Sequence, residues 1–328
     1  MIWLRIFLAG VLLSIQPLAN REAQPPAGEI AVLLWHDSPN DRSALLGLKR
    51  GLLALGLADR LRVIELQGDA DRAERELVRI ESNRGAALVV ALGTEAARLA
   101  RRHLVTTPVV FTAVTNPVLS GVVASWDGAG GRICGNSNWL DAAELIRTFR
   151  LALPEMRTLA VLRSDGNAVS AAEVAEAREV IRLERDLDLK DCVVREPAEL
   201  DAVLAAALSS ADALWIPIDF QLYQEEPQAR IMRRARQAGV PVVSSTKRCA
   251  GAGALLVLTI DYELLGLQAA GLVKRVLLDG QDPGAIPVGR LSSHRMILDV
   301  GAARAIGRSL PLDLVFRAHQ ILGHEDGK

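Results

Sequence analysis

After an apolar amino-terminal stretch, the chain alternates short apolar runs rich in β-branched residues with longer segments whose apolar positions recur at helical spacing. Short apolar runs bounded by turn residues predict buried strands, and the helical period predicts amphipathic helices. The predicted strands are Glu29–Trp35, Arg62–Leu66, Ala86–Leu92, Pro108–Val114, Thr158–Arg163, Asp191–Arg195, Ala213–Ile218, Pro241–Ser244, Ala254–Ile260 and Met296–Val300. The predicted helices are Arg42–Leu57, Asp71–Asn83, Glu95–His103, Leu140–Leu153, Ala171–Leu187, Ala198–Ser209, Tyr223–Ala238, Tyr262–Asp279 and Ala302–Arg308. This alternation predicts an α/β fold with parallel sheets covered on both faces and right-handed crossovers.

The segment 125–132, Ser-Trp-Asp-Gly-Ala-Gly-Gly-Arg, interrupts this alternation. It is rich in glycine and separates two sets of strand–helix units, so it fits a boundary between two lobes. A length of 328 residues is enough for two hydrophobic cores.

Composition narrows the class of protein. Apolar residues make up 50% of the chain and charged residues 23%, which is typical of a globular protein. The formal net charge is −1, so no basic excess points to a nucleic-acid partner. The spacings of Cys134, Cys192 and Cys249 match no metal site. A Cys134–Cys249 disulfide is one alternative, and free buried thiols are the favoured one.

The amino terminus has the pattern of a secretory signal peptide. Arg5 precedes the apolar run Ile6–Ile15, which is too short to span a bilayer, and Ala19 or Ala23 marks a cleavage site. We expect residues 1–23 to be a signal peptide and 24–28 a linker, with an uncleaved anchor as the alternative. No later apolar run has spanning length. We therefore expect a periplasmic protein whose mature chain is not inserted in the membrane.

Motifs of common enzymes are missing from the sequence. It has no G-x-S-x-G elbow, no H-E-x-x-H pair, no phosphate-binding loop and no dinucleotide fingerprint, and its five histidines form no metal spacing. We expect no enzymatic activity, no catalytic residue, no metal and no cofactor.

Polar side chains follow several predicted strands at the point where each strand ends. Ligands of open parallel sheets bind outside the carboxyl ends of the strands. In the first half these residues are Trp35, His36, Thr94, Thr115 and Asn116. Thr94 opens a helix whose amides can hold an anion. Trp35 and His36 could form a stacking wall, the alternative being a core tryptophan and a surface histidine.

In the second half, Asp219 and Phe220 follow one strand, Ser244 closes the next, and Asp261 opens a helix. A carboxylate at position 219 could hold a ligand ammonium by charge-assisted hydrogen bonds. Both aspartates could instead cap helices or, for Asp219, form an ion pair at a hinge.

Four stretches carry a resemblance to a known family: ALGTEAARLARRHLVTTPVVFTAVTNPVLSGVV (91–123), DALWIPIDFQLY (212–223), AGVPVVSSTK (238–247) and GALLVLTIDYELLGLQAAGLVKRVLLDGQDPGAIPV (253–288). In order and spacing they resemble the ABC-transporter substrate-binding proteins whose best-known members bind tryptophan or tyrosine.

The resemblance implies a type I periplasmic-binding-protein fold: two similar doubly wound parallel-sheet lobes joined by three crossing segments. Lobe 1 would hold 29–117 plus 259–287, and lobe 2 would hold 118–258 plus 288–328. It implies a monomer that captures a small molecule, an amino acid or related zwitterion, between its lobes and delivers it to an ABC transporter permease. A sensory module acting with a partner receptor would use the same fold. A transcription-regulator core is disfavoured by the signal peptide and by the lack of a DNA-binding headpiece.

The resemblance also bears on single residues. Asp219 and Asp261 match aspartates of the family, whereas Asn116 stands where the family usually has aspartate. Ser137 matches a serine near the first crossing, and its alternative role is to cap the helix that follows. A zwitterion would then meet Thr94 and helix amides with its carboxylate and Asp219 with its ammonium. Trp35 and Phe220 would contact its side chain.

Overall fold

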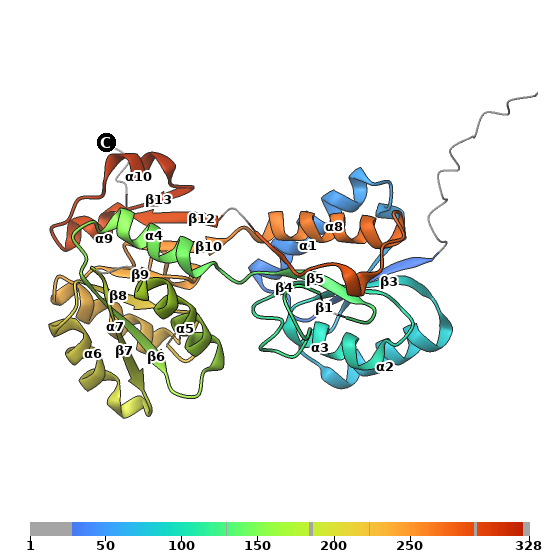
Figure 1. The fold of residues 1–328 in the computed structure, drawn as a ribbon, viewed down its shortest axis with the longest axis horizontal. Helices are drawn as coiled ribbons and strands as arrows, with labels where there is room; N and C mark the ends of the chain where they lie inside the picture. Colours follow the sequence, from blue (N-terminus) through green and yellow to red (C-terminus); the bar gives the residue numbers. More distant parts are fainter. Residues whose placement is uncertain (1–27, 129, 184–185, 223, 292–293, 324–328) are drawn as a thin grey trace, which may run out of the picture.

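The computed structural model describes residues 28–128, 130–183, 186–222, 224–291 and 294–323. The expected signal peptide and nearly all of its linker lie outside the described residues. Figure 1 shows two lobes side by side, joined by thin connecting segments. No helix among the described residues is long and apolar enough to cross a membrane.

The first lobe is built on a wholly parallel sheet of six strands. Its strands in spatial order are β11 (Gly289–Arg290), β5 (Ile133–Ser137), β4 (Val109–Val114), β3 (Ala86–Leu92), β1 (Glu29–Leu34) and β2 (Leu61–Glu65). Helices α1 (Pro39–Ala54) and α8 (Tyr262–Leu277) cover one face, and α2 (Ala70–Asn83) and α3 (Thr94–His103) cover the other (Figure 1).

Both faces of this sheet are buried, which explains the continuous apolar runs in the sequence. Side chains alternate along a strand, so Ala31 and Leu33 pack with α2 and α3, whereas Ile30 and Val32 pack with α1 and α8.

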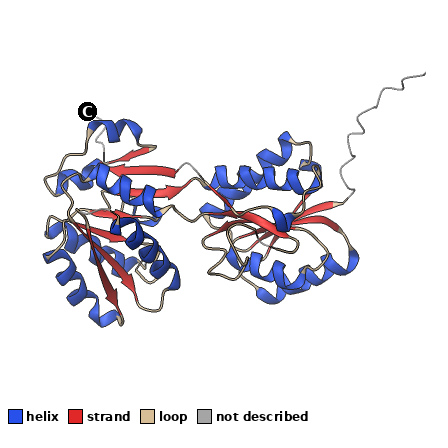
Figure 2. Cartoon of the chain, in the orientation of Figure 1, coloured by secondary structure: helices blue, strands red, loops and turns tan. Residues whose placement is uncertain are grey.

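The second lobe is built on a seven-stranded sheet, drawn with its helices in Figure 2. Its strands in spatial order are β13 (Gln320–Leu322), β12 (His294–Asp299), β10 (Leu256–Ile260), β9 (Val242–Ser244), β8 (Ala213–Ile216), β6 (Thr158–Ser164) and β7 (Asp188–Val194). Neighbouring strands are parallel except for the antiparallel pair β10 and β12.

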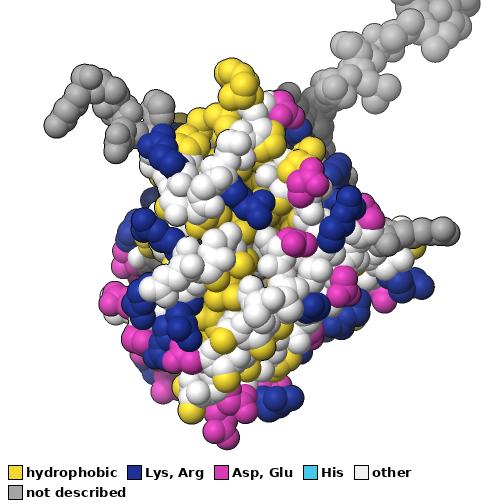
Figure 3. Space-filling view, turned by 90° about the vertical axis from the view of Figure 1, so that its left-hand side faces the viewer, with side chains coloured by type: hydrophobic (Ala, Val, Ile, Leu, Met, Phe, Trp, Pro, Cys, Tyr) yellow, Lys and Arg dark blue, Asp and Glu magenta, His cyan; other side chains and the backbone are white. Residues whose placement is uncertain are grey.

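Helices cover both faces of this sheet as well. One face packs against α4 (Ala142–Ala152), α5 (Ala168–Arg182), α9 (Val300–Ala305) and α10 (Leu312–Arg317), and the other against α6 (Leu200–Ser209) and α7 (Glu225–Gln237). Short 3₁₀ turns are η1 (Ala58–Arg60), η2 (Pro197–Glu199), η3 (Lys247–Cys249) and η4 (Pro283–Ala285). Figure 3 views the outer end of this lobe, where acidic and basic side chains are interspersed.

Strand pairing moves the expected lobe boundaries. Residues 118–137 were expected in lobe 2, but β5 pairs with β4 in the first sheet, and Val122 and Val123 pack into its core. The pair Thr259–Ile260, expected in lobe 1, is the end of β10 in the second sheet, and β11, expected in lobe 2, pairs with β5. Strand β5 was not predicted because Gly135 and two polar residues resemble a turn. The glycine is needed there, since a Cβ at 135 would overlap Phe111.

Three connections cross between the lobes: β5 to α4, β10 to α8, and β11 to β12. The first leaves the carboxyl end of a parallel strand of the first sheet, and the second leaves the carboxyl end of β10, which runs parallel to β9. The carboxyl edges of both sheets therefore lie toward the crossings, and so toward the other lobe.

Candidate functional site

Trp35 and Gly93 are neighbours at the carboxyl edge of the first sheet. Strands β1 and β3 pair through Leu34 and Leu92, so the next residues of each strand lie side by side. A Cβ on Gly93 would be 3.5 Å from the Cβ of Trp35. Trp35 is half-buried against the core on the α2 and α3 side, and the exposed His36 ring meets it edge-on with centroids 5.9 Å apart. The structure thus places an indole directly beside the start of α3.

The amino terminus of α3 offers backbone donors at this point. Its N-cap is Gly93, with φ of 98°, and no side chain caps the helix. Thr94 is the first helical residue and is half-buried. The first amides of a helix have no partner within the helix and carry partial positive charge. Thr94 and these amides therefore form a place where an anionic group can bind.

Asn116 closes a turn after β4. Its Oδ1 accepts a hydrogen bond from the backbone N–H of Leu119 at 3.0 Å, and its carbonyl accepts from the N–H of Ser120 at 2.9 Å and from the Ser120 hydroxyl at 2.8 Å. Asn116 is buried, and these hydrogen bonds all join it to residues of the same turn. Thr115, half-buried beside it, accepts at Oγ1 from Asn138 Nδ2 at 3.4 Å.

Ser137 is fully buried and braces two strand ends. Its Oγ lies 2.8 Å from the carbonyls of Val114 and Thr115 and accepts from the N–H of Trp139. It does not cap α4, because Asp141 does so. Ser137 was expected at the site surface, and the structure instead places it beneath that surface.

The next residue, Asn138, was missed by the sequence reasoning. Its Nδ2 donates to the Tyr262 hydroxyl at 3.0 Å, and its buried Oδ1 has no partner among the described residues. Burial raises the pKa of Tyr262 to about 12. This pair joins the first crossing to the start of α8.

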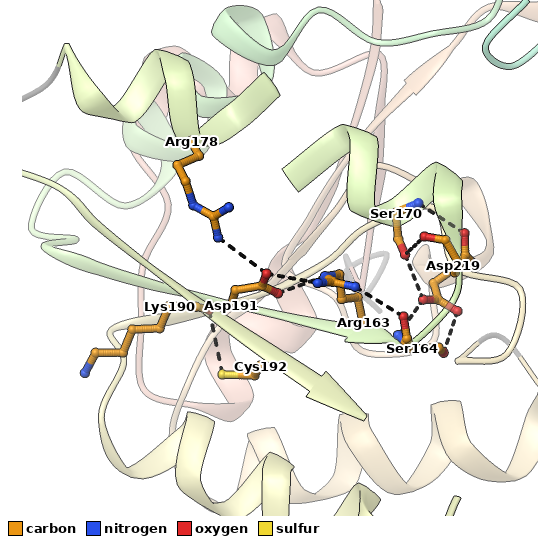
Figure 4. Close-up of polar contacts among 9 residues, drawn as sticks. Arg163, Ser164, Ser170, Arg178, Lys190, Asp191, Cys192 and Asp219 are labelled. Carbon is orange, nitrogen blue, oxygen red and sulfur yellow. Dashed lines mark hydrogen bonds and ion pairs between the residues drawn. The ribbon is translucent and has the colours of Figure 1, made fainter. Parts of the chain in front are cut away.

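Asp219 is fully buried, with 0% of its surface exposed. Its Oδ2 accepts from the Ser164 N–H at 2.7 Å and the Ser170 hydroxyl at 3.1 Å, and its Oδ1 accepts from the Ser164 hydroxyl at 2.8 Å; Figure 4 shows Ser164 and Ser170 beside Asp219. Oδ1 also accepts from the Gln221 N–H at 3.1 Å. Four donors occupy the acceptor positions of a carboxylate. The structure therefore makes Asp219 a buried brace between β6, α5 and the loop after β8, and not the ammonium acceptor expected from the sequence.

Ser244 has a similar structural role, whereas Phe220 does not. The fully buried Ser244 hydroxyl donates to the carbonyl of Ile216 at 2.8 Å and accepts from the N–H of Thr246, so it joins the ends of β8 and β9. Phe220 is 62% exposed on the loop after β8.

Asp261 joins two of the crossings. Its Oδ1 caps α8 by accepting from the N–H groups of Glu263 and Leu264, and its Oδ2 lies 3.2 Å from Arg295 on β12. A cavity of about 160 Å³ lies here, lined among others by Asn40, Lys247 and Tyr262. A larger cavity of about 540 Å³, between α7 and α9, contains none of the predicted site residues. Asp261 thus caps α8 and forms an ion pair with Arg295 that links two of the crossings.

A buried carboxylate that the sequence reasoning missed lies at the edge of the second sheet. Glu173 of α5 is 4% exposed, and its Oε2 accepts from the N–H of Ile218 at 2.7 Å. Among the described residues, its Oε1 and the Oγ of Ser245, which is also 4% exposed, make no hydrogen bond of normal geometry, but the Ser245 hydroxyl faces the carboxylate and lowers its pKa. Burial raises the pKa of Glu173 to about 7. A single buried Glu on a helix gives no sequence signal.

The cysteines are free within the described part of the chain. Cys134 and Cys249 are buried and Cys192 is half-buried. Burial raises the pKa of Cys134 to about 12, so this thiol is inert. No cluster of metal ligands occurs among the described residues.

Known proteins share this fold. The structure matches the ABC domain from Streptococcus pneumonia solved in complex with L-Trp, with TM-score 0.68, 23% identity and coverage of 90% of this chain and 100% of the other. It also matches the ligand-free, open structure of a substrate-binding protein with adhesive properties from Clostridium difficile, with TM-score 0.82, 18% identity and coverage of 91% and 100%. These matches confirm the predicted fold class.

Sequence comparison identifies the family. A curated relative, the tyrosine-binding protein of Clostridioides difficile (strain R20291), is 25% identical over 219 residues. That match covers 67% of this chain and 62% of the relative's length. The family described as ABC transporter substrate binding protein matches residues 29–322. Since this match spans most of the chain and confirms the resemblance seen in the sequence, the protein belongs to the ABC transporter substrate-binding protein family.

Proposed function

We propose that the protein captures an amino acid or a related zwitterion between its two lobes and delivers it to the permease of an ABC importer. Members of its family are solute-binding proteins and not enzymes, in agreement with the lack of catalytic motifs. Two relatives support the choice of ligand, since one is named for tyrosine and the other was solved with L-Trp.

One observation carries the proposal: Trp35 lies beside the uncapped amino terminus of α3. The helix amides and Thr94 suit a ligand carboxylate, and the indole suits a flat apolar side chain. When the lobes close, water is expelled from around these contacts, and the electrostatic attraction between ligand and protein becomes stronger.

Export to the periplasm is part of the proposal. Arg5, the apolar run Ile6–Ile15 and the small residues after it support a cleaved signal peptide over residues 1–23. Cell fractionation with sequencing of the mature amino terminus tests this. Uncleaved protein in the cytoplasm would refute it.

A thermal-shift panel tests the ligand. Purified protein is screened against the amino acids, small organic acids and nucleosides, because a ligand at 100 times its Kd stabilises the folded state by about 2.7 kcal/mol. An amino acid should give the largest shift. Trp35→Ala should weaken the binding of that amino acid by about tenfold or more. Phe316→Ala, at an 86% exposed position on α10, is the matched control. A shift only with nucleosides, or with none of the compounds, would refute the proposal.

A further inference from the structure

The second lobe holds a buried polar group at the carboxyl edge of its sheet that the proposed function does not yet use. Glu173 reaches the carboxyl edge of its sheet because side chains on a helix lean toward the amino terminus. There its Oε2 accepts from Ile218, just beyond β8, and Ser245 follows β9 directly. Strands β8 and β9 are central in the sheet, and their carboxyl ends lie toward the first lobe.

The first crossing also contacts this part of α5. The indole N–H of Trp139, two residues beyond β5, donates to Oε2 of Glu176 at 2.8 Å. Glu173 is one helical turn from Glu176, so it lies close to the junction of the lobes.

The polar atoms at this point are only weakly paired. Oε1 of Glu173 and Oγ of Ser245 are both buried and make no hydrogen bond of normal geometry within the described chain, although the Ser245 hydroxyl faces the carboxylate closely enough to lower its pKa. A buried polar group without a partner costs about 1–3 kcal/mol, so these two atoms call for an explanation. Glu173 offers an acceptor, and Ser245 offers either an acceptor or a donor.

The charges around Glu173 favour a cation. The charged groups facing it are two further carboxylates, Glu176 on the same helix and Asp219 on the loop after β8. Asp219 is saturated by its four donors and Glu176 is half-buried, so Glu173 is the carboxylate of the three with a buried oxygen that makes no hydrogen bond of normal geometry among the described residues. An ammonium has three donors and no acceptor, which suits two adjacent oxygen atoms.

We propose that Glu173, with Ser245 beside it, binds the ammonium group of the ligand when the lobes close. This inference rests on the proposed function and names the chemistry that the second lobe recognises: a primary amine, opposite the carboxylate-binding amides of α3. The site takes over the role that the sequence had given to Asp219.

Calorimetric titration with three matched probes tests the inference. For tryptophan they are L-tryptophan, tryptamine, which lacks the carboxylate, and indole-3-propionate, which lacks the ammonium; the tyrosine series has the same design. The wild-type protein should bind the amino acid and lose about tenfold or more in affinity for the deaminated acid, because the acid leaves Glu173 without a partner. Equal or tighter binding of the deaminated acid would overturn the inference.

Two variants locate the effect. Glu173→Gln keeps the shape and the acceptor for Ile218 but removes the charge, and should weaken binding of the amino acid about tenfold or more while leaving the deaminated acid unchanged. Glu179→Gln, at an exposed position on the same helix, is the control. Melting curves show whether both variants fold. The titration of the wild-type protein with the three probes tests the inference even if a variant does not fold.

Proton release gives a second readout. The pKa of Glu173 is about 7 in the free protein, so at pH 6 most of its carboxyl groups are protonated, and ammonium binding should expel the proton. Titrations in buffers of different ionisation enthalpy should detect release by the wild type at pH 6 and none by Glu173→Gln. If the amino acid binds but Glu173→Gln behaves as Glu179→Gln does, the inference is wrong and the proposed function stands. If the wild type binds none of the amino acids of the thermal-shift panel, both are wrong.

Discussion

The backbone N–H of Ser164 lies 2.7 Å from Oδ2 of Asp219, and the Ser164 hydroxyl lies 2.8 Å from Oδ1 of the same carboxylate. This double contact joins the end of β6 to the loop after β8, so one buried side chain holds two neighbouring strand exits in register. The same carboxylate accepts from Ser170 in the first turn of α5. The geometry of this edge of the second lobe therefore depends on Asp219.

Asp219→Ala should lower the free energy of unfolding by about 3 kcal/mol, because it leaves several buried donors without an acceptor. Urea denaturation measures the loss. Asp165→Ala, at an exposed position of the neighbouring turn, is the control and should change stability by less than about 0.5 kcal/mol. Ligand affinity per folded Asp219→Ala molecule should stay within a few-fold of wild type. Unchanged stability with lost affinity would restore Asp219 as a direct ligand contact.

Glu81 plays a comparable part in the first lobe. Its Oε1 accepts from the N–H groups of Val105 and Thr106, and its Oε2 accepts from the N–H and hydroxyl of Thr107. Burial raises the pKa of Glu81, but the hydrogen bonds from the two threonines outweigh it and hold the pKa at about 2. The carboxylate thus fixes the loop between α3 and β4.

Glu81→Gln should therefore destabilise the protein by about 1–2 kcal/mol at pH 7. This is less than the whole lowering of the Glu81 pKa would imply, because the carboxylate is partly exposed and solvent screens its charge. A lowered pKa gives stability that is present above the unfolded value and lost as pH falls toward 2. The difference from wild type, measured by urea denaturation, should shrink between pH 5 and pH 3. A constant difference over that range would show that charge is not involved. Glu65→Gln, at an exposed position on β2, serves as the control.

The sequence predicted the architecture well because the central strands are buried on both faces. Short runs of β-branched and other apolar residues bounded by turn signals, such as Ala86–Leu92, are typical of strands in such a sheet, and this one begins and ends as predicted. It failed at β5, where Gly135 permits close approach to Phe111 and looks like a turn residue. It also failed at α10 (Leu312–Arg317), where Leu312 and Phe316 are exposed and give no amphipathic period.

The candidate site was harder to predict for a physical reason. Sequence reasoning finds polar residues at strand ends, but it does not tell an exposed side chain from one that braces the edge below. Trp35 and Thr94 are at least partly accessible, whereas Ser137, Asp219 and Ser244 are fully buried and bonded to protein groups. Glu173 lies in the interior of a helix, so only the fold reveals that it meets Ile218 and Ser245.

We expect the two lobes to close on ligand binding, because thin crossing segments join them (Figure 1). Three segments join the lobes, and the pair Asp261 and Arg295 links two of them. Such hinges move on the microsecond-to-millisecond scale, and a ligand contacting both lobes favours the closed form. Small-angle X-ray scattering should show a smaller radius of gyration at ligand saturation. An unchanged radius at saturation would mean that binding does not close the lobes.

Two glycines allow α8 to pack closely on α1. A Cβ on Gly266 would overlap the backbone carbonyl of Ala44, and a Cβ on Gly47 would overlap that of Glu263. Gly266→Ala should therefore destabilise the protein by about 2 kcal/mol or more, since backbone must move apart. Gly271→Ala, on the exposed side of the same helix with no neighbour within 4 Å, should stabilise it by about 0.5–1 kcal/mol. Thermal unfolding of both variants measures the contrast. Equal effects would show that the helices can separate at little cost.

The free protein should lose stability with rising pH because of Glu173. Burial raises the pKa of this carboxyl from 4.5 to about 7, so the folded state holds the proton more tightly than the unfolded state does. For an acid whose folded pKa is raised, stability is highest below the unfolded value and falls as pH rises toward the folded value. The cost is at most about 3 kcal/mol at pH 8. Glu173→Gln does not ionise and escapes this cost, while Ile218 keeps its acceptor. The stability of this variant relative to wild type should therefore rise between pH 5 and pH 8, as measured by urea denaturation, whereas that of Glu179→Gln should not. A relative stability of Glu173→Gln that stays the same at both pH values would show that the Glu173 carboxyl is already ionised at pH 5, and the proton release expected on ligand binding would then be absent too.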